Sequence, residues 1–311
     1  MHRTFLVALA ACLALGAGPV SAQRTPSPRR DAALERELAE LARGVRGTVG
    51  IYVRHLRTGA TAEINADSVF PTASMVKVPI LVGVFDAVEQ GRLRWKDTLA
   101  YRDSLLYPGE DILGNLKDGA PITLDQVALL MMTMSDNTAS LWLQHLAGTG
   151  TTINAWLEAH GFRHTRINSR TPGREENRTQ FGWGQTSPRE MAELLVRIRE
   201  GRAVSPAADQ EMYRLLTRPY WTGEGLSQLP PWVQVAVKNG AVDRSRSEVM
   251  LVNAPSGDYV VCVITKGQED TSWVPDNEGF VLLRKVTAHL WRRFEPKHPF
   301  TPAPGASRFK P

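Results

Sequence analysis

The sequence predicts an α+β fold, in which an antiparallel sheet carries helices and a second lobe is wholly helical. Two observations lead to this prediction. Strand-like segments lie near both ends of the globular region, whereas helical patterns fill its middle; the strands are expected at 49–55, 61–64, 233–238, 248–252 and 259–265. Hairpin signals between neighbouring segments favour antiparallel pairing. The first and last strands are therefore expected to share one sheet.

The individual elements follow from hydrophobic spacing and from residues that start or stop helices. Apolar residues at helical spacing predict a first helix at 32–45, and Arg57-Thr58-Gly59 marks the turn between the first two strands. An apolar helix is expected at 74–90, stopped by Gly91. Further helices are expected at 122–134, 138–147, 152–160, 187–200, 206–217 and 277–294, and irregular chain at 97–121 and 161–185.

Composition excludes several classes of protein. The chain has 311 residues, with 37 Lys+Arg against 32 Asp+Glu and a formal net charge of +5. Its basic residues are interleaved with acidic ones, so a dedicated nucleic-acid reader is not expected. Two cysteines, Cys12 and Cys262, are too few for a zinc ribbon or a disulfide framework. His160 and His164 are four residues apart, but Gly161 interrupts the helix between them, so neither a metal site nor a cofactor is expected.

The first 22 residues have the features of a secretory signal peptide. A short basic start precedes an almost wholly apolar run at 5–18, and Val20-Ser21-Ala22 is a small-residue cleavage site. We therefore expect an exported protein, periplasmic or secreted. A lipoprotein signal ending at Cys12 is the less favoured alternative, because the apolar run continues past that residue. No later apolar run reaches 18 residues, so no membrane span is expected after processing.

The mature chain is expected to form one catalytic domain and no stable complex, that is, a monomer. A linker at 23–30 precedes the domain at 31–294, and a Pro-rich tail at 295–311 is expected to be disordered. The domain is discontinuous. Its α/β lobe takes 31–75 and 205–294, and its helical lobe takes 76–204.

Three short motifs carry the chemistry. Ser74 and Lys77 form S-x-x-K at the start of an apolar helix, where positions i and i+3 share one face. Ser135-Asp136-Asn137 lies between two helices, and Lys238-Asn239-Gly240 ends a strand. A serine hydroxyl is a poor nucleophile without a base beside it, and a partly desolvated lysine amine can serve as that base.

The remaining roles follow from the same arrangement. The Ser74 N–H at a helix start and the Ala241 N–H beyond the strand could bind an oxyanion. Ser135 could relay a proton, Asn137 could hold a substrate amide, and Lys238 adds positive charge for an anionic substrate. Each motif also has a purely structural interpretation: Ser74 could be a helix N-cap, and S-D-N a capping turn in which Asp136 does the structural work.

In order and separation, the three motifs resemble those of class A β-lactamases and related penicillin-recognising active-site serine hydrolases. The resemblance covers residues 31–294 and includes Thr133 to Ala139 around S-D-N. It implies a five-stranded antiparallel sheet with flanking helices plus an all-helical lobe. It also implies acylation of Ser74 by a β-lactam or a peptidoglycan-like small molecule, and a substrate-carboxylate contact at Lys238 and Asn239. Arg246 lies where family members often keep a carboxylate-binding arginine, with Arg244 as the alternative.

Two departures from the family pattern bear on function. Asn239 replaces the usual Thr or Ser of the third motif and lacks their hydroxyl. The Glu that activates the deacylating water in the family would fall on Pro172, so Glu175 or Glu176 is the candidate base from a rearranged loop. Three functions follow: hydrolysis of β-lactam antibiotics, a D,D-peptidase or esterase on the same scaffold, or a penicillin-binding protein with little turnover.

Overall fold

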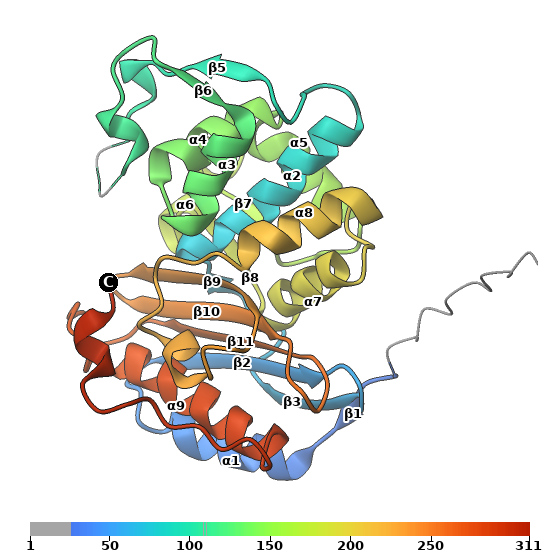
Figure 1. The fold of residues 1–311 in the computed structure, drawn as a ribbon, viewed down its shortest axis with the longest axis vertical. Coiled ribbons are helices and arrows are strands. Elements are labelled where there is room, and N and C mark those ends of the chain that lie inside the picture. The colour runs from blue at the N-terminus through green and yellow to red at the C-terminus, as the bar shows by residue number, and fades with distance from the viewer. Residues whose placement is uncertain (1–25, 108, 110) are drawn as a thin grey trace, which may run out of the picture.

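The computed structural model describes residues 26–107, 109 and 111–311. The expected signal peptide, its cleavage site and Cys12 lie outside the described residues. The described chain forms two lobes, one built on a sheet and one built of helices (Figure 1). This is the α+β architecture expected from the order of the elements.

The sheet of the first lobe has six strands, one more than the resemblance implies. Their order across the sheet is β1 (Arg29–Arg30), β3 (Ala60–Ile64), β2 (Thr48–His55), β11 (Tyr259–Lys266), β10 (Ser245–Val252) and β9 (Val235–Val242). Strands β3, β2, β11, β10 and β9 pair antiparallel, whereas the two-residue β1 pairs parallel with β3. The additional strand comes from the segment expected to be a linker.

The two ends of the domain meet in the middle of this sheet. Strand β11 lies between β2 and β10, with Tyr259 opposite His55 and Cys262 opposite Val249. The prediction that the first and last strands share a sheet is therefore confirmed. Strand β9 lies at the edge of the sheet.

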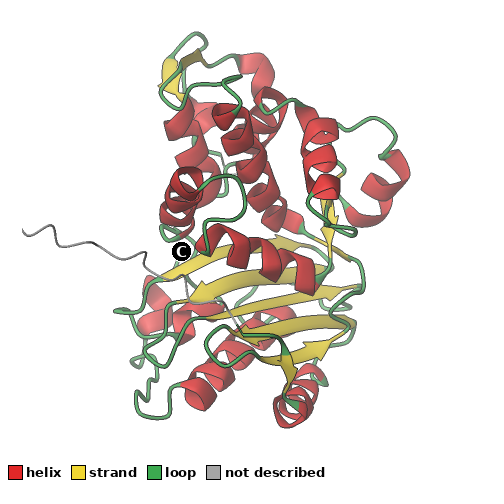
Figure 2. Ribbon diagram, turned by 90° about the vertical axis from the view of Figure 1, so that its right-hand side faces the viewer, coloured by secondary structure: helices red, strands yellow, loops and turns green. Residues whose placement is uncertain are grey.

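Helices cover both faces of the sheet (Figure 2). Helices α1 (Ala32–Ala42) and α9 (Glu278–Phe294) pack on one face, and α7 (Pro188–Arg199) packs on the other. Because successive side chains of a strand point to opposite faces, the strands divide their apolar residues between two cores. Val237 and Met250 belong to the core under α9, whereas Val249 and Cys262 belong to the core that continues into the helical lobe.

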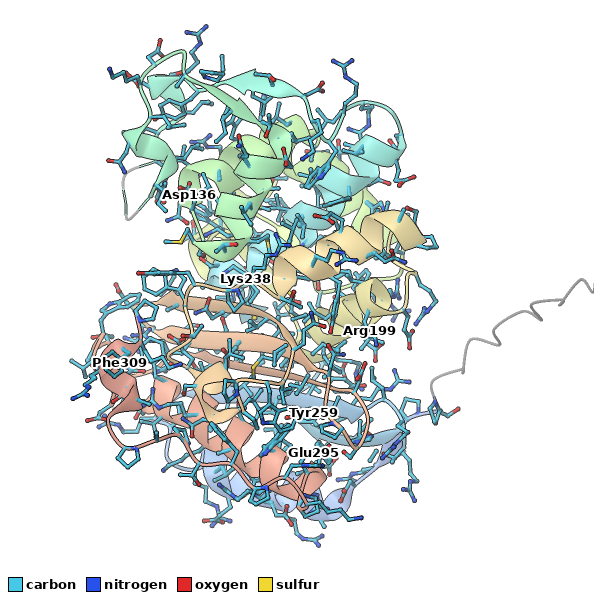
Figure 3. The ribbon with its side chains drawn as sticks, viewed as in Figure 1. Asp136, Arg199, Lys238, Tyr259, Glu295 and Phe309 are labelled. Carbon is cyan, nitrogen blue, oxygen red and sulfur yellow. The ribbon has the colours of Figure 1, made fainter. Side chains whose placement is uncertain are left out.

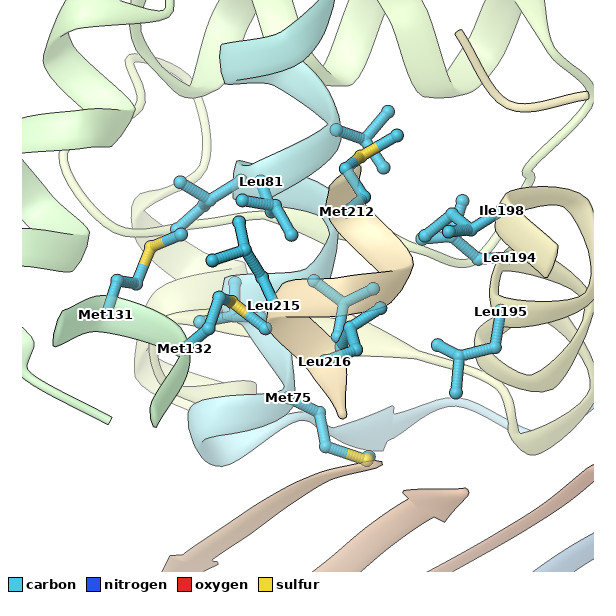
Figure 4. Close-up of a cluster of buried hydrophobic side chains, with 14 of the residues drawn as sticks. Met75, Leu81, Met131, Met132, Leu194, Leu195, Ile198, Met212, Leu215 and Leu216 are labelled. Atoms are coloured by element: carbon cyan, nitrogen blue, oxygen red, sulfur yellow. The ribbon is translucent and has the colours of Figure 1, made fainter. Parts of the chain in front are cut away.

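The helical lobe packs around the apolar helix α2 (Lys77–Glu89). Its other long helices are α3 (Leu124–Thr133), α4 (Asn137–Leu146), α5 (Thr149–Ala159) and α8 (Pro206–Leu216). Leucine and methionine side chains from α2, α3, α7 and α8 interlock in its core, and Met75 extends toward the strands (Figure 4). Each such side chain contributes about 1.5–3 kcal/mol on full burial, so this core fixes the start of α2 firmly.

The two stretches expected to be irregular contain short elements. In the first, β5 (Thr98–Ala100) pairs with β6 (Pro121–Thr123), and two 3₁₀ turns, η2 (Asp103–Leu105) and η3 (Leu113–Asn115), lie between them. In the second, β7 (Arg166–Ile167) and β8 (Gly184–Thr186) form a small sheet with β4 (Phe70–Pro71), and helix α6 (Glu175–Phe181) lies between β7 and β8.

The segment after α9, expected to be disordered, instead has a defined path along the sheet lobe. Trp291 Nε1 donates a hydrogen bond to the His298 carbonyl at 2.7 Å, and a 3₁₀ turn, η5 (Ala306–Phe309), follows. Within the described part of the chain, no helix combines the length and the apolar character needed to cross a bilayer.

Candidate active site

Ser74 lies at the point where the chain passes from the sheet lobe into the helical lobe. It belongs to the 3₁₀ turn η1 (Ala73–Val76), so α2 itself begins only at Lys77. Met75 and Val76 anchor the turn in the core. Ala73, directly before Ser74, has φ 44°. A left-handed backbone at a non-glycine residue costs about 1–3 kcal/mol and is concentrated at functional sites.

Lys77 connects Ser74 to the second motif. Its side chain is fully buried, and its Nζ lies 3.0 Å from Ser74 Oγ, 3.0 Å from Ser135 Oγ, 2.6 Å from the Ser135 carbonyl oxygen and 2.8 Å from Asn137 Oδ1. A neutral Lys77 has two N–H donors and one lone pair. It can therefore donate to the Ser135 and Asn137 carbonyl oxygens and accept from the Ser74 hydroxyl, which is the geometry of a base for Ser74.

The surroundings of Lys77 favour this neutral form. Burial holds the pKa of Lys77 well below its usual range, and nearby Lys238 lowers that pKa further. Asp111 and Asp136 act in the opposite direction but are weaker causes than burial. The amine can therefore take up the proton that Ser74 must lose when it attacks an acyl group.

Ser135 and Asn137 are held by the capping of α4. Ser135 has φ 62°, and Asp136 after it is fully buried as the N-cap. The Asp136 carboxylate accepts a hydrogen bond from the Ala139 N–H at 2.8 Å and from the N–H groups of Ile112 and Leu113 at 2.9 Å each. Asp136 thus joins the loop at 101–116 to the start of α4, and it acts as a positioning residue for both neighbours.

Asp111 is a second positioning residue, which the sequence does not reveal. Its carboxylate accepts hydrogen bonds from the N–H groups of Asn137 and Thr138, both at 2.8 Å, and from Thr138 Oγ1 at 2.7 Å. Asp111 lies in irregular chain without any periodic pattern, so only the folded structure brings it to the helix start. Two carboxylates therefore fix the orientation of Asn137 beside Lys77.

Lys238 approaches the same place from the sheet. It lies on edge strand β9 with 2% of its surface exposed, on the side that faces the helical lobe (Figure 3). Its Nζ donates to the Asn239 carbonyl at 3.0 Å and to Asn239 Oδ1 at 3.3 Å. Burial lowers the pKa of Lys238 to about 7, against the opposing effect of Glu224 and Glu248.

Gly240 brings the backbone of β9 against the start of η1. A Cβ at this position would lie 2.7 Å from the Thr72 carbonyl oxygen and 2.8 Å from the Ser74 nitrogen. Real Cβ atoms essentially never come this close to another heavy atom, so only glycine fits here. Ala241 is the next residue of β9, so its N–H is the candidate second oxyanion donor beside that of Ser74.

Replacing Gly240 with alanine should reduce acylation of Ser74 by about 10²-fold or more, because the new methyl group must push β9 away from η1 and separate the two donors. The rate of covalent labelling by a penicillin, followed by intact mass, measures this effect. Gly44→Ala is the matched control, since a Cβ there has only the Leu41 carbonyl within 4 Å, at 3.9 Å. Equal labelling rates of the Gly240→Ala variant and the wild type would contradict the role given to this contact.

The structure does not bring Arg246 to the site. Strand alternation sends its side chain to the α9 face, while neighbouring Ser247 faces Thr72. The buried guanidinium donates to the Ser245 carbonyl at 3.0 Å and the Ser272 carbonyl at 2.6 Å. It also lies 4.5 Å from the ring centroid of Trp273 and 4.7 Å from that of Phe280. The expected substrate arginine is therefore a structural residue here, and Arg244 points to the Gly267 carbonyl at 3.4 Å.

Glu175 and Glu176 lie in the first turn of α6, and both are exposed. Glu175 accepts a hydrogen bond from the Gly173 N–H at 3.1 Å, within its own loop. Among the described residues, no acidic side chain lies within hydrogen-bond distance of Ser74 Oγ. In this conformation the loop therefore supplies no base next to the nucleophile.

Comparison with known proteins agrees with this geometry. A β-lactamase from Rhodobacter capsulatus is 25% identical over 93% of this chain and 98% of its own length, and β-lactamase CARB-3 from Pseudomonas aeruginosa is 23% identical over 80% and 86%. Among solved structures, PBP-A shares 28% identity with a TM-score of 0.77, covering 88% of this chain and 99% of PBP-A.

A β-lactamase structure from Sphaerobacter thermophilus shows the same fold, with 24% identity and a TM-score of 0.76 over 86% of this chain and all of the other. The family model described as the β-lactamase enzyme family matches residues 33–294, which is nearly the whole domain. The fold and the motif order together lead to the same assignment: this chain is a member of the β-lactamase enzyme family.

Proposed function

We propose that the protein is a serine hydrolase of the class A β-lactamase type, which forms an acyl-enzyme on Ser74 and hydrolyses β-lactams. The single observation that carries this proposal is the placement of buried Lys77 within 3.0 Å of both Ser74 Oγ and Ser135 Oγ. A nucleophile, a base of lowered pKa and a second hydroxyl in contact form the arrangement that acyl transfer requires.

The reaction proceeds in two stages. Ser74 Oγ attacks the lactam carbonyl carbon while Lys77 takes its proton, and the N–H groups of Ser74 and Ala241 stabilise the oxyanion. The C–N bond of the ring then breaks, and the departing nitrogen receives a proton relayed by Ser135. Water hydrolyses the resulting ester and releases Ser74. Asn137 holds the amide of the substrate side chain.

An intact-mass time course with a penicillin, combined with measurement of the hydrolysed product, tests the proposal. Hydrolysis predicts a transient adduct on Ser74 and steady accumulation of product. No adduct on a folded protein would contradict the proposal and favour an esterase on the same scaffold, because a penicillin-recognising D,D-peptidase would itself be acylated. A stable adduct without product would identify a penicillin-binding protein with little turnover.

A specific observation favours this last alternative. Deacylation needs a base for the attacking water, and both carboxylates of the loop at 168–185 are exposed. PBP-A, a structural relative, was solved as an L158E mutant in an acyl-enzyme complex with penicillin G. The rate of the second stage therefore decides between the two functions.

We propose Glu175 or Glu176 as the base, reaching the acyl-enzyme after the loop rearranges. Of Glu175→Gln and Glu176→Gln, the variant that lacks the base should deacylate about 10²-fold more slowly and acylate at the wild-type rate. Glu158→Gln, an exposed glutamate in nearby α5, is the control. If neither variant prolongs the lifetime of the adduct, water is activated elsewhere.

We also propose export to the periplasm or the medium, supported by the basic, apolar and small-residue regions of the first 22 residues. Detection of a mature N-terminus at Gln23 would support it. Retention of the first residues on cell-associated protein would contradict it, and a lipid on Cys12 would favour the alternative.

A further inference from the structure

A carboxylate of the chain itself accepts a hydrogen bond from the Asn239 side chain of the third motif. Glu224 lies directly before the 3₁₀ turn η4 (Gly225–Gln228), and its Oε2 is 3.4 Å from Asn239 Nδ2. On its other side, the Asn239 amide oxygen accepts from Lys238 Nζ at 3.3 Å. Glu224, Asn239 and Lys238 thus form one hydrogen-bonded row along the edge of β9.

A second carboxyl group lies beneath this row. Glu248 stands opposite Asn239 in the pairing of β10 with β9, and 2% of its surface is exposed. Its Oε2 accepts a hydrogen bond from the Gly225 N–H at 3.0 Å, while its buried Oε1 has no hydrogen-bond partner among the described residues. A Cβ on Gly225 would overlap Glu248 Oε2 and Thr287 Oγ1. The chain around Glu224 is therefore seated closely on Glu248.

The charges of this cluster do not suit an anionic ligand. Burial, followed by Glu224, raises the pKa of Glu248 to about 8, while burial lowers that of Lys238 to about 7. Near neutral pH, Lys238 therefore carries only part of a positive charge, beside the Glu224 carboxylate. The Arg246 guanidinium does not offset these carboxyl groups, because it donates to the backbone carbonyls of Ser245 and Ser272.

We propose that Glu224 takes the place of a substrate carboxylate beside Lys238 and Asn239, so that the site selects acyl donors bearing an uncharged ester or amide at that position. This inference rests on the proposed function, because it names which substrates acylate Ser74. The physical reason is twofold. Glu224 already engages one N–H of the Asn239 amide, and an incoming carboxylate would lie against a like charge.

A penicillin and its methyl ester, which differ only in the charge at this position, test the inference. The second-order rate of Ser74 acylation is measured by intact mass for both compounds, with wild type and Glu224→Gln. Wild type should react with the ester at least as fast as with the acid. Glu224→Gln keeps the shape of the side chain but removes its charge, so it should raise the rate with the acid about tenfold and leave the rate with the ester within about threefold.

Glu40→Gln is the matched control, since it makes the same charge change on α1, which packs on the face of the sheet opposite α7. Its ratio of acid to ester rates should equal that of wild type. A wild-type preference for the acid of about tenfold or more, or a Glu224→Gln variant with an unchanged ratio, would overturn the inference while adduct formation still supports the acyl-enzyme. No adduct with either compound on folded wild type would instead remove the proposed function, and the inference with it.

Discussion

Replacing Ser74 with alanine should abolish covalent labelling by a penicillin and reduce any β-lactam turnover by about 10⁴-fold or more. The reason is direct: the variant lacks the oxygen that forms the ester, and its neighbours Lys77, Ser135 and the two backbone N–H groups cannot form a covalent bond in its place. Intact mass measures the labelling, and absorbance of the lactam ring measures turnover.

The fold should tolerate this change, because the Ser74 hydroxyl is not a helix cap in the structure. Ser68→Ala is the matched control, an exposed serine six residues upstream, and it should be labelled at the wild-type rate. Labelling of the Ser74→Ala variant at the same stoichiometry as wild type would show that another group is the nucleophile. Peptide mapping of the adduct would then identify that group.

Replacing Lys77 with arginine should reduce the rate of Ser74 acylation by about 10²- to 10⁴-fold. Arginine places a cationic side chain of similar length at this position, but its guanidinium stays protonated and cannot accept the Ser74 proton. A reduced acylation rate in this variant would therefore show that Lys77 acts as a base and not only as a positive charge. Lys266→Arg is the control, because Lys266 also donates to a backbone carbonyl, that of Val69 at 2.8 Å.

The pH dependence of wild type gives a second readout of the same residue. Since only the neutral amine accepts a proton, acylation should rise with pH through the lowered pKa of Lys77 and level off above it. The midpoint of this increase should lie at a pH well below 10.5, the ordinary pKa of lysine. The Lys77→Arg variant should lack this rise. An unchanged profile in the variant would assign the titration, and the base, to a different group.

The sequence reveals the parts of the site that depend on local geometry. Ser74 and Lys77 are three residues apart, so any helical turn brings them together, and Ser135 and Asn137 belong to one capping turn. Their joining to Lys238 could be inferred from motif order and family resemblance. These inferences need no knowledge of which side chains meet across the fold.

What the sequence conceals depends on register and on long-range contacts. The sequence predicts that the strand at 248–252 begins at Glu248, whereas β10 begins at Ser245. Without that boundary, the alternation that sends Arg246 to the far face and Ser247 toward Thr72 could not be assigned. The contact between Glu224 and Asn239 joins irregular chain to a strand. Helix α6 spans 7 residues, too few to give a hydrophobic period.

Strand β11 has a consequence for the order in which the chain matures. It is the last strand in sequence but lies in the middle of the sheet, between β2 and β10. A growing chain can therefore form its α2 region early, yet it cannot unite Ser74 with Lys238 until residue 266 has entered the sheet. Such long-range pairing is slow because the entropy cost of closing the loop is incurred before the strand contacts can stabilise the chain. Acylation of Ser74 therefore requires the completely folded domain. A chain that ends before β11 would contain Ser74 but not the assembled active site.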